Sequence, residues 1–309
     1  MSQLIPARIA TPTTAEDDPR VGHVLGRSAT PDSAAVVLVG FPTDRGVQRN
    51  GGRRGAAEAP TAIREQLFRL TPDPESPETF TRLLESTCDL GDVAMSGDLE
   101  TDQERLAETL EPHLARGAVA IILGGGHETA YGHFLGYVRA GRPVAILNWD
   151  AHADVRPLVD DLGHSGSPFR QALAHPSGLC RNYTVAGLNP TTVARAHLDF
   201  ISERGGAAYF NTEVNFTVVE SILAAHEFES LVTFDLDAVD SAAAPGVSAP
   251  ATAGLSPHIW LYAAYRAGRT ATVRSMDVVE LCPPHDVDRR TARLAARTVW
   301  EFLRGLAAR

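Results

Sequence analysis

The stretch of sequence that decides the fold is residues 144–154, in which Val144-Ala-Ile-Leu-Asn-Trp leads into Asp150-Ala-His152-Ala-Asp154. The apolar run is typical of a strand buried on both faces of a parallel sheet. Residues two apart on a strand share a face, so the three ionisable side chains can point the same way where the strand ends. Such a crowded group stays desolvated and self-repelling unless a positive charge compensates it. The motif therefore predicts a metal site.

Two other apolar runs end in residues of the same kind. Residues 118–123 lead into Gly124-Gly-Gly-His127-Glu128, and a later run ends at Asp235-Leu-Asp237. Taken alone, an Asp-x-Asp after a strand is commonly a turn or a helix cap, and a histidine flanked by glycines is a weaker signal still. The occurrence of all three motifs at strand ends favours one shared metal site over three unrelated turns.

The donor atoms of these motifs indicate which metal is bound. Two histidines and four aspartates suffice for a pair of divalent cations, each with one histidine, with four carboxylate charges balancing four metal charges. An oxygen-rich set without thiolate favours Mn²⁺ over a structural Zn²⁺ or an iron–sulfur centre, and Mg²⁺ usually keeps more of its own water. The predicted ligands of two Mn²⁺ ions are His127, Asp150, His152, Asp154, Asp235 and Asp237.

Alternating patterns along the chain predict an α/β fold. Apolar runs fall at 35–39, 118–123, 143–147, 183–187, 231–236 and 273–279, and amphipathic segments at about 57–70, 101–116, 129–140, 191–204, 213–226, 256–267 and 288–306. Strands that alternate with helices imply a central parallel sheet with helices on both faces, and ligands bind such sheets beyond the carboxyl ends of the strands. We expect one catalytic domain over 34–309, preceded by an irregular N-terminal arm over 1–33 that is rich in Thr, Pro, Ala and Asp.

Composition narrows the class of protein. The net charge of −10 argues against nucleic acid as a partner. No apolar stretch approaches the ~20 residues of a membrane helix, so no membrane association is expected. The three cysteines, Cys88, Cys180 and Cys282, are odd in number and widely spaced. A disulfide framework is therefore not expected, and a cytoplasmic location is predicted.

The three motifs together resemble those of a known superfamily. The glycine-histidine, Asp-x-His-x-Asp and Asp-x-Asp segments, in this order, resemble the metal-binding signatures of the ureohydrolase superfamily, the family of arginases and agmatinases. The similarity runs from about residue 36 to the end of the chain. Within the superfamily the chain is most similar to formimidoylglutamases, on the segments 46–56, 154–157, 165–170 and 244–250. The resemblance implies a single-domain arginase-like fold, two Mn²⁺ ions and a homo-oligomer, either a trimer or a hexamer.

The resemblance also implies a reaction on a small-molecule substrate. For a formimidoylglutamase it is the hydrolysis of N-formimidoyl-L-glutamate to L-glutamate and formamide, by attack of a metal-bridging hydroxide on the amidine carbon. Glu280, at the end of the last strand run, matches the family's carboxylate that accepts hydrogen bonds from the cationic amidine. The alternative for Glu280 is a surface or helix-capping glutamate.

Arg156 is the residue that we expect to separate this chain from other ureohydrolases. It stands two positions after Asp154, where arginases and agmatinases have a small polar residue and formimidoylglutamases have arginine. A substrate with two carboxylates requires guanidinium recognition of this kind. The alternative is that Arg156 merely neutralises the local acidic cluster. Asn50 and Arg53 are further candidates for substrate binding.

One position departs from the arginase pattern. Arginases and agmatinases place a histidine before a glycine as the proton shuttle to the leaving amine, whereas this chain has Ser165-Gly166, with His164 one residue earlier. Formimidoylglutamases typically have serine or threonine there. Ser165 and His164 are therefore the remaining candidates for a catalytic role, and the pattern weakens the case for guanidine hydrolysis.

Three hypotheses follow from the sequence. The first is formimidoylglutamate hydrolysis. The second is an agmatinase-like or other guanidino-acid amidinohydrolase that releases urea, which would share the metals but have less use for Arg156. The third is a metal-stabilised binding or regulatory protein without catalysis, which the complete set of ligand positions together with Glu280 disfavours.

Overall fold

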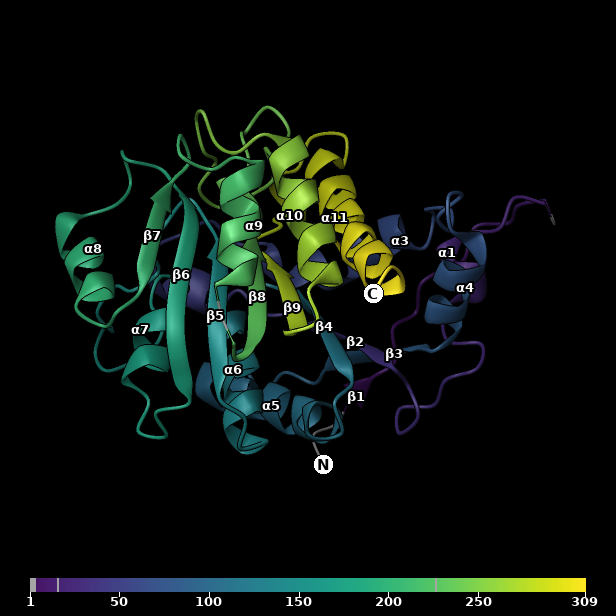
Figure 1. The fold of residues 1–309 in the computed structure, drawn as a ribbon, viewed down its shortest axis with the longest axis horizontal. Helices are drawn as coiled ribbons and strands as arrows, with labels where there is room; N and C mark the ends of the chain where they lie inside the picture. The colour runs from purple at the N-terminus through teal and green to yellow at the C-terminus, as the bar shows by residue number, and fades with distance from the viewer. Residues whose placement is uncertain (1–3, 16, 226) are drawn as a thin grey trace.

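The computed structural model describes residues 4–15, 17–225 and 227–309, which form a nine-stranded sheet between two layers of helices (Figure 1). The strands are β1 (Leu4–Ile5), β2 (Val36–Phe41), β3 (Thr87–Val93), β4 (Val119–Gly124), β5 (Val144–Trp149), β6 (Cys180–Leu188), β7 (Ala207–Phe210), β8 (Glu229–Asp235) and β9 (Val273–Val279). Their order across the sheet is β1-β3-β2-β4-β9-β8-β5-β6-β7. Only β1 is antiparallel to its neighbour among these strands.

The helices complete the layers. They are α1 (Val21–Val24), α2 (Arg45–Arg49), α3 (Ala59–Leu67), α4 (Pro77–Glu85), α5 (Leu99–Ala115), α6 (Thr129–Arg139), α7 (Pro168–Ala174), α8 (Arg195–Ser202), α9 (Phe216–Ala224), α10 (Pro257–Arg269) and α11 (Arg290–Ala307). Short 3₁₀ turns occur at Ala56–Glu58, Leu236–Ala238 and Pro283–His285. The α/β fold class with a central, mostly parallel sheet is confirmed.

The alternation of side chains along each strand divides the core in two. On β4, Val119, Ile121 and Leu123 pack toward α3, α9, α10 and α11, whereas Ala120 and Ile122 pack toward α5 and α6. This period of two is the geometry of a strand that is buried on both faces. Each face of the sheet therefore has its own apolar core.

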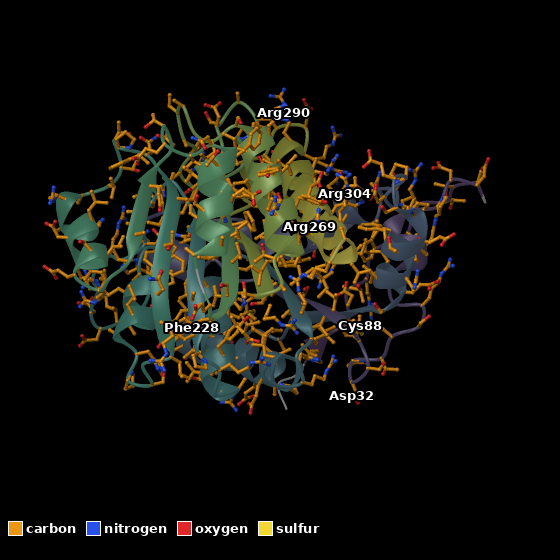
Figure 2. All side chains as sticks on the ribbon, viewed as in Figure 1. Asp32, Cys88, Phe228, Arg269, Arg290 and Arg304 are labelled. Atoms are coloured by element: carbon orange, nitrogen blue, oxygen red, sulfur yellow. The ribbon has the colours of Figure 1, made fainter. Side chains whose placement is uncertain are left out.

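The helices keep their polar faces in water. In Figure 1, α9, α10 and α11 lie together in front of the sheet, with α5 and α6 below and behind it. Figure 2 shows Arg269, Arg290 and Arg304 on the α10 and α11 layer, and the first two are exposed. Among the described residues, no helix combines the length and apolar character that crossing a bilayer requires.

Some elements were not expected from the sequence. All six predicted strands are present, but β3 and β7 have no predicted counterpart. β3 carries Asp89, Gly91 and Asp92, residues that are depleted in strands, and the four residues of edge strand β7 are only partly buried.

The arm over 1–33 is not wholly irregular, because β1 and α1 lie within it. The domain boundary after residue 33 stays a prediction. The three cysteines are all free.

A buried ion-pair network explains how β3 tolerates its aspartates. Arg64 of α3 is fully buried and donates from Nε and Nη2 to both oxygens of Asp89, and from Nη1 to Asp92 at 2.6 Å. A fourth hydrogen bond runs from Nη2 to the carbonyl of Gly91 at 3.0 Å. The guanidinium thus compensates two carboxylates and joins α3 to the sheet next to β2.

We expect Arg64→Met to destabilise the protein by about 3–5 kcal/mol, because it leaves two carboxylates without their partner. Urea unfolding followed by circular dichroism measures this loss. Arg195→Met is the matched control, since Arg195 is 85% exposed in its pair with Asp199 and should cost less than about 1 kcal/mol. Equal stability of the two variants would contradict the prediction.

Candidate metal centre and active site

Four neighbouring strands in the middle of the sheet carry the site. β4, β9, β8 and β5 are adjacent and parallel, so their carboxyl ends meet at one edge. Asp235 is the last residue of β8, and the segments that follow β4, β9 and β5 supply His127, Glu280 and Asp150 respectively. Parallel strands therefore bring together residues up to 153 positions apart, at the edge where open α/β sheets bind ligands.

The two Asp-x-ligand motifs have the same local structure. Asp150 Oδ1 accepts a hydrogen bond from the backbone N–H of His152 at 2.6 Å, and Asp235 Oδ1 accepts one from Asp237 at 2.9 Å. Each aspartate thereby closes a turn as its strand ends. In both motifs this leaves Oδ2 of the first aspartate to face the centre of the site.

One imidazole nitrogen lies among three carboxylates. His127 Nδ1 is 2.9 Å from Asp235 Oδ2, 3.0 Å from Asp154 Oδ2 and 3.3 Å from Asp150 Oδ2. These four residues are buried and form one of two groups whose donor atoms can hold a metal ion. The geometry places a nitrogen and three carboxylate oxygens around one point.

A second group lies beside the first. His152 Nδ1 is 3.1 Å from Asp237 Oδ2 and 3.5 Å from Asp150 Oδ1. Asp150, His152 and Asp237 are the donors of this group. Asp150 belongs to both groups, with Oδ2 near His127 and Oδ1 near His152, and would be shared by two bound ions. All six residues that the sequence predicted as metal ligands are brought together.

The charges of the cluster fit bound cations. Burial, and then the neighbouring carboxylates of Asp237 and Asp150, raise the pKa of Asp235 well above its usual value. His127 Nδ1 and Asp237 Oδ1 are buried without a hydrogen bond of acceptable geometry to any described residue. A divalent cation requires donor atoms of this kind, whose lone pairs face one point and are not used in hydrogen bonds. The donor set is thus suited to two ions.

Outer contacts fix the orientation of the donors. His127 Nε2 is 2.9 Å from Thr233 Oγ1, which leaves Nδ1 as the metal-facing nitrogen when Nε2 carries the proton. Asn148 Nδ2 donates to Asp150 Oδ2 at 3.0 Å. Such contacts fix the tautomer of a ligating histidine and hold the ligating carboxylates in place.

A cavity of about 290 Å³ opens above the cluster. It is lined by Asn50, Gly51, Gly52, Arg53, His152, Asp154, Arg156, Ser165, Asp235, Asp237, Ser248, Ala249 and Glu280. Its walls thus combine the aspartates with both arginines that the sequence predicted for substrate binding.

Glu280 is a buried residue in the lining of this cavity. Its Oε1 accepts the backbone N–H of His127 at 2.8 Å, and its Oε2 makes no hydrogen bond to the described residues. The surface-glutamate alternative is excluded, because the side chain is 5% exposed. Glu280 and Asp154 both have a positive φ, 68° and 43°. Left-handed backbone is costly for residues with a side chain and concentrates at functional sites.

Arg156 is held at the cavity by a neutral partner. Its Nη1 donates to Asn50 Oδ1 at 2.9 Å, and Asn50 Nδ2 donates to Ser165 Oγ at 3.0 Å. No ion pair joins Arg156 to any carboxylate of the described residues. This favours a binding role over neutralisation of the acidic cluster, because the positive charge is left for a ligand.

Arg53 makes more hydrogen bonds to the protein than Arg156 does. Its Nε donates to the carbonyl of Ser248 at 3.0 Å, its Nη2 donates to the carbonyl of Val247, and its backbone N–H donates to Ser248 Oγ at 2.8 Å. The side chain therefore ties the loop after α2 to the loop before α10. Its Nη1 makes no hydrogen bond within the described residues and stays available to the cavity.

His164 does not line the cavity. Its Nε2 contacts the carbonyl of Pro157 at 3.0 Å, and its Nδ1 accepts from the backbone N–H of Gly166 at 3.1 Å. The residue is 2% exposed and does not line the cavity. His164 thus helps to hold the loop, whereas Ser165 lines the cavity, and a part for His164 in proton transfer stays a prediction.

Sequence reasoning missed the outer contacts of the site. Thr233 and Glu128 stand inside the predicted motifs, yet neither was given a role. The signal for Thr233 is its place two residues before Asp235 on the same face of β8. Asn148 offers the same signal, because it stands two residues before Asp150 at the end of β5. The spacing alone does not show which partner the side chain meets.

We expect Thr233→Val to weaken Mn²⁺ binding about 10–100-fold, since valine keeps the volume but removes the partner of His127 Nε2. Calorimetric titration of metal-free protein with Mn²⁺ gives the affinity. Thr184→Val on β6 is the matched control, because Thr184 is also buried but bonds only to Asn182. An unchanged affinity in Thr233→Val would show that this contact does not orient the ligand.

The model of the Arginase family matches residues 34–305. Formimidoylglutamases from Chromobacterium violaceum and Aromatoleum aromaticum are 34% and 39% identical over 291 and 295 residues, which cover 90% and 89% of this chain and 91% and 84% of theirs. The structure of Trypanosoma cruzi formiminoglutamase with Mn²⁺ aligns with a TM-score of 0.88 at 32% identity, over 95% of this chain and 100% of that chain. The chain belongs to the arginase family of hydrolases.

Proposed function

We propose that this protein is a dinuclear manganese hydrolase that cleaves N-formimidoyl-L-glutamate to L-glutamate and formamide. The observation that carries the proposal is the placement of Arg156. It lines the same cavity as the aspartate cluster and Glu280 and has no ion-pair partner among the described residues. A cavity with an acidic base and a free guanidinium at its wall is complementary to a substrate with a cationic amidine at one end and carboxylates at the other.

The relatives support both the substrate and the metal. The relatives from C. violaceum and A. aromaticum are formimidoylglutamases, and the T. cruzi formiminoglutamase structure contains Mn²⁺. The donors of this chain, four carboxylates and two imidazoles, suit the same ion. When bound, two divalent ions supply hydroxide at neutral pH by lowering the pKa of water between them.

Glu280 orients the electrophile. Because Oε1 is held by the backbone N–H of His127, Oε2 is the oxygen that accepts hydrogen bonds from the amidinium N–H groups. A charge-assisted bond of this kind fixes the amidine carbon above the aspartate cluster. The same backbone contact holds the carboxylate of Glu280 at the cavity before substrate binds.

The two arginines select the end of the substrate that carries its two carboxylates. A fork of N–H donors matches a carboxylate bidentately. Arg156 lines the cavity with Nη1 engaged by Asn50, and its other side-chain N–H groups make no hydrogen bond within the described residues. Arg53 offers Nη1 to the second carboxylate while its other donors hold the loop. Two carboxylates thus meet two guanidinium groups at the cavity wall.

Ser165 takes the position at which guanidine hydrolases place a histidine. Its hydroxyl oxygen accepts from Asn50, so its own proton is free to hydrogen-bond the substrate nitrogen that leaves as an amine. Collapse of the tetrahedral intermediate breaks the bond from the amidine carbon to the glutamate nitrogen. That nitrogen gains the proton that the hydroxyl group of the intermediate loses as the carbonyl of formamide forms. Formamide and L-glutamate are the products.

The competing function is hydrolysis of agmatine or of a guanidino acid with release of urea. It shares the aspartate cluster, but a cationic tail would lie against Arg156. We further propose that the protein is cytoplasmic and forms a homo-oligomer, either a trimer or a hexamer. Sedimentation velocity measures the oligomeric state.

A substrate panel tests the function. Protein stripped with a chelator should be inactive, and Mn²⁺ should restore release of L-glutamate and formamide from N-formimidoyl-L-glutamate. Arginine, agmatine and guanidinobutyrate are assayed in parallel for urea. Urea release at a comparable kcat/KM would overturn the proposal in favour of a guanidino substrate, and full activity without metal would remove the metal centre from the reaction.

We expect Arg156→Leu to lower kcat/KM for N-formimidoyl-L-glutamate by the equivalent of about 2–5 kcal/mol, the range for one broken side of a desolvated charge pair. Manganese stoichiometry should not change, because Arg156 is not a donor of either metal group. Arg54→Leu removes an exposed positive charge from the same region and serves as the control. If Arg156→Leu matches the parent enzyme, the main argument for this substrate fails.

A further inference from the structure

A buried carboxylate next to the metal centre has no role in the reaction described so far. Glu128 follows His127, is 1% exposed, and belongs to neither metal group nor the cavity lining. Its Oε1 accepts the backbone N–H of Gly46 at 2.6 Å, and its Oε2 has no partner among the described residues. Burial of a carboxylate is costly, so the position of Glu128 needs a physical reason.

The chain is shaped to hold this side chain. A Cβ atom at Gly46 would lie 2.5 Å from Glu128 Cδ, and one at Gly126 would lie 2.2 Å from Glu128 Oε2. Both distances are far below normal contact, and neither glycine is marked by a left-handed backbone. The two glycines are therefore needed for space, and they let the carboxylate lie between the metal-binding loop and α2.

Glu128 accepts a backbone N–H in the first turn of α2, where Asp44, the residue before the helix, makes no capping hydrogen bond. Asp44 precedes the helix but gives no side-chain cap. Its oxygens instead accept from Gln48 Nε2 at 2.6 Å and from the N–H of Gly55 at 2.8 Å. The first turn of α2 is thus fixed by a carboxylate 82 positions away.

A continuous series of hydrogen bonds leads from Glu128 to the substrate-binding arginine. Glu128 accepts from the N–H of Gly46, and the carbonyl of Gly46 accepts from the N–H of Asn50 at 3.0 Å. Asn50 Oδ1 then accepts from Arg156 Nη1, and Asn50 Nδ2 donates to Ser165. Displacement of α2 would move Asn50 and release Arg156 from its orientation.

We propose that Glu128 is a positioning residue for substrate selection, which fixes α2 so that Asn50 holds Arg156 toward the carboxylate of the substrate. The proposal rests on the proposed function for the identity of the substrate. It separates the role of Glu128 from that of His127, its neighbour in sequence, which faces the metals. The segment 125–128 thus couples the metal centre to the substrate-binding wall.

The test compares binding with chemistry in the manganese-loaded enzyme. Glu128→Ala should raise KM for N-formimidoyl-L-glutamate at least about tenfold while kcat stays within about threefold and manganese stoichiometry is unchanged. Glu128→Gln keeps an acceptor oxygen for Gly46 and should restore KM to within about threefold of the parent. Glu58→Ala removes an exposed carboxylate from the 3₁₀ turn before α3 and is the control. Formamidine, which has no carboxylate to recognise, should be hydrolysed equally by parent and Glu128→Ala.

Hydrogen exchange supplies a readout that does not depend on the substrate. Amides of residues 46–52 should exchange faster in Glu128→Ala than in the parent, with no change in residues 129–139. An unchanged exchange rate or an unchanged KM overturns the proposal, as does a loss of manganese together with activity, which would place Glu128 in support of the metal loop. If the parent does not hydrolyse N-formimidoyl-L-glutamate, the proposed function fails and the exchange experiment still decides the role of Glu128. Glu128→Asp, which withdraws the carboxylate, replaces Glu128→Ala if the latter does not fold.

Discussion

The crowding of four aspartates at the end of adjacent buried strands is the constraint on which the rest of the site depends. Asp150, Asp154, Asp235 and Asp237 lie within reach of two imidazoles and largely out of water. Repulsion among them is the physical reason that the pKa of Asp235 is raised, after burial itself. Without cations this cluster opposes folding, and with two divalent ions the same charges attract. Stability of the strand ends and competence of the site are therefore linked.

The surrounding structure holds this cluster by contacts that carry no net charge. Backbone N–H groups close the turns at Asp150 and Asp235, and the Thr233 hydroxyl faces the second nitrogen of His127. Neutral partners orient a donor without competing for its charge. The same principle applies at the cavity wall, where Asn50 rather than an aspartate holds Arg156. Both the aspartate cluster and the guanidinium of Arg156 thus keep their charges for ligands.

The strands and metal motifs could be predicted from sequence because their signals are local. An apolar run followed by ligands at i, i+2 and i+4 needs no tertiary information, and all six ligand positions converge in the structure. β3 could not be predicted, since its aspartates are compensated by Arg64 from a separate helix. His164 is one residue from the cavity-lining Ser165, but sequence cannot show which of the two faces the cavity. The order β4-β9-β8-β5 likewise depends on long crossovers.

The placement of the arginines answers an electrostatic difficulty that the proposed substrate raises. The chain has a net charge of −10, of which bound divalent ions offset only the four aspartates of the cluster. A substrate tail with two carboxylates would be repelled by such a surface at long range, although salt screens this beyond about 8–10 Å. Arg156 and Arg53 line the cavity and bring two positive charges to its wall, where the tail of the proposed substrate would bind. Glu280 lies deeper, with the opposite sign for the amidinium. The cavity therefore presents positive charge at its wall and negative charge at its base, and this polarity orients a substrate that carries the complementary dipole before any atom reacts.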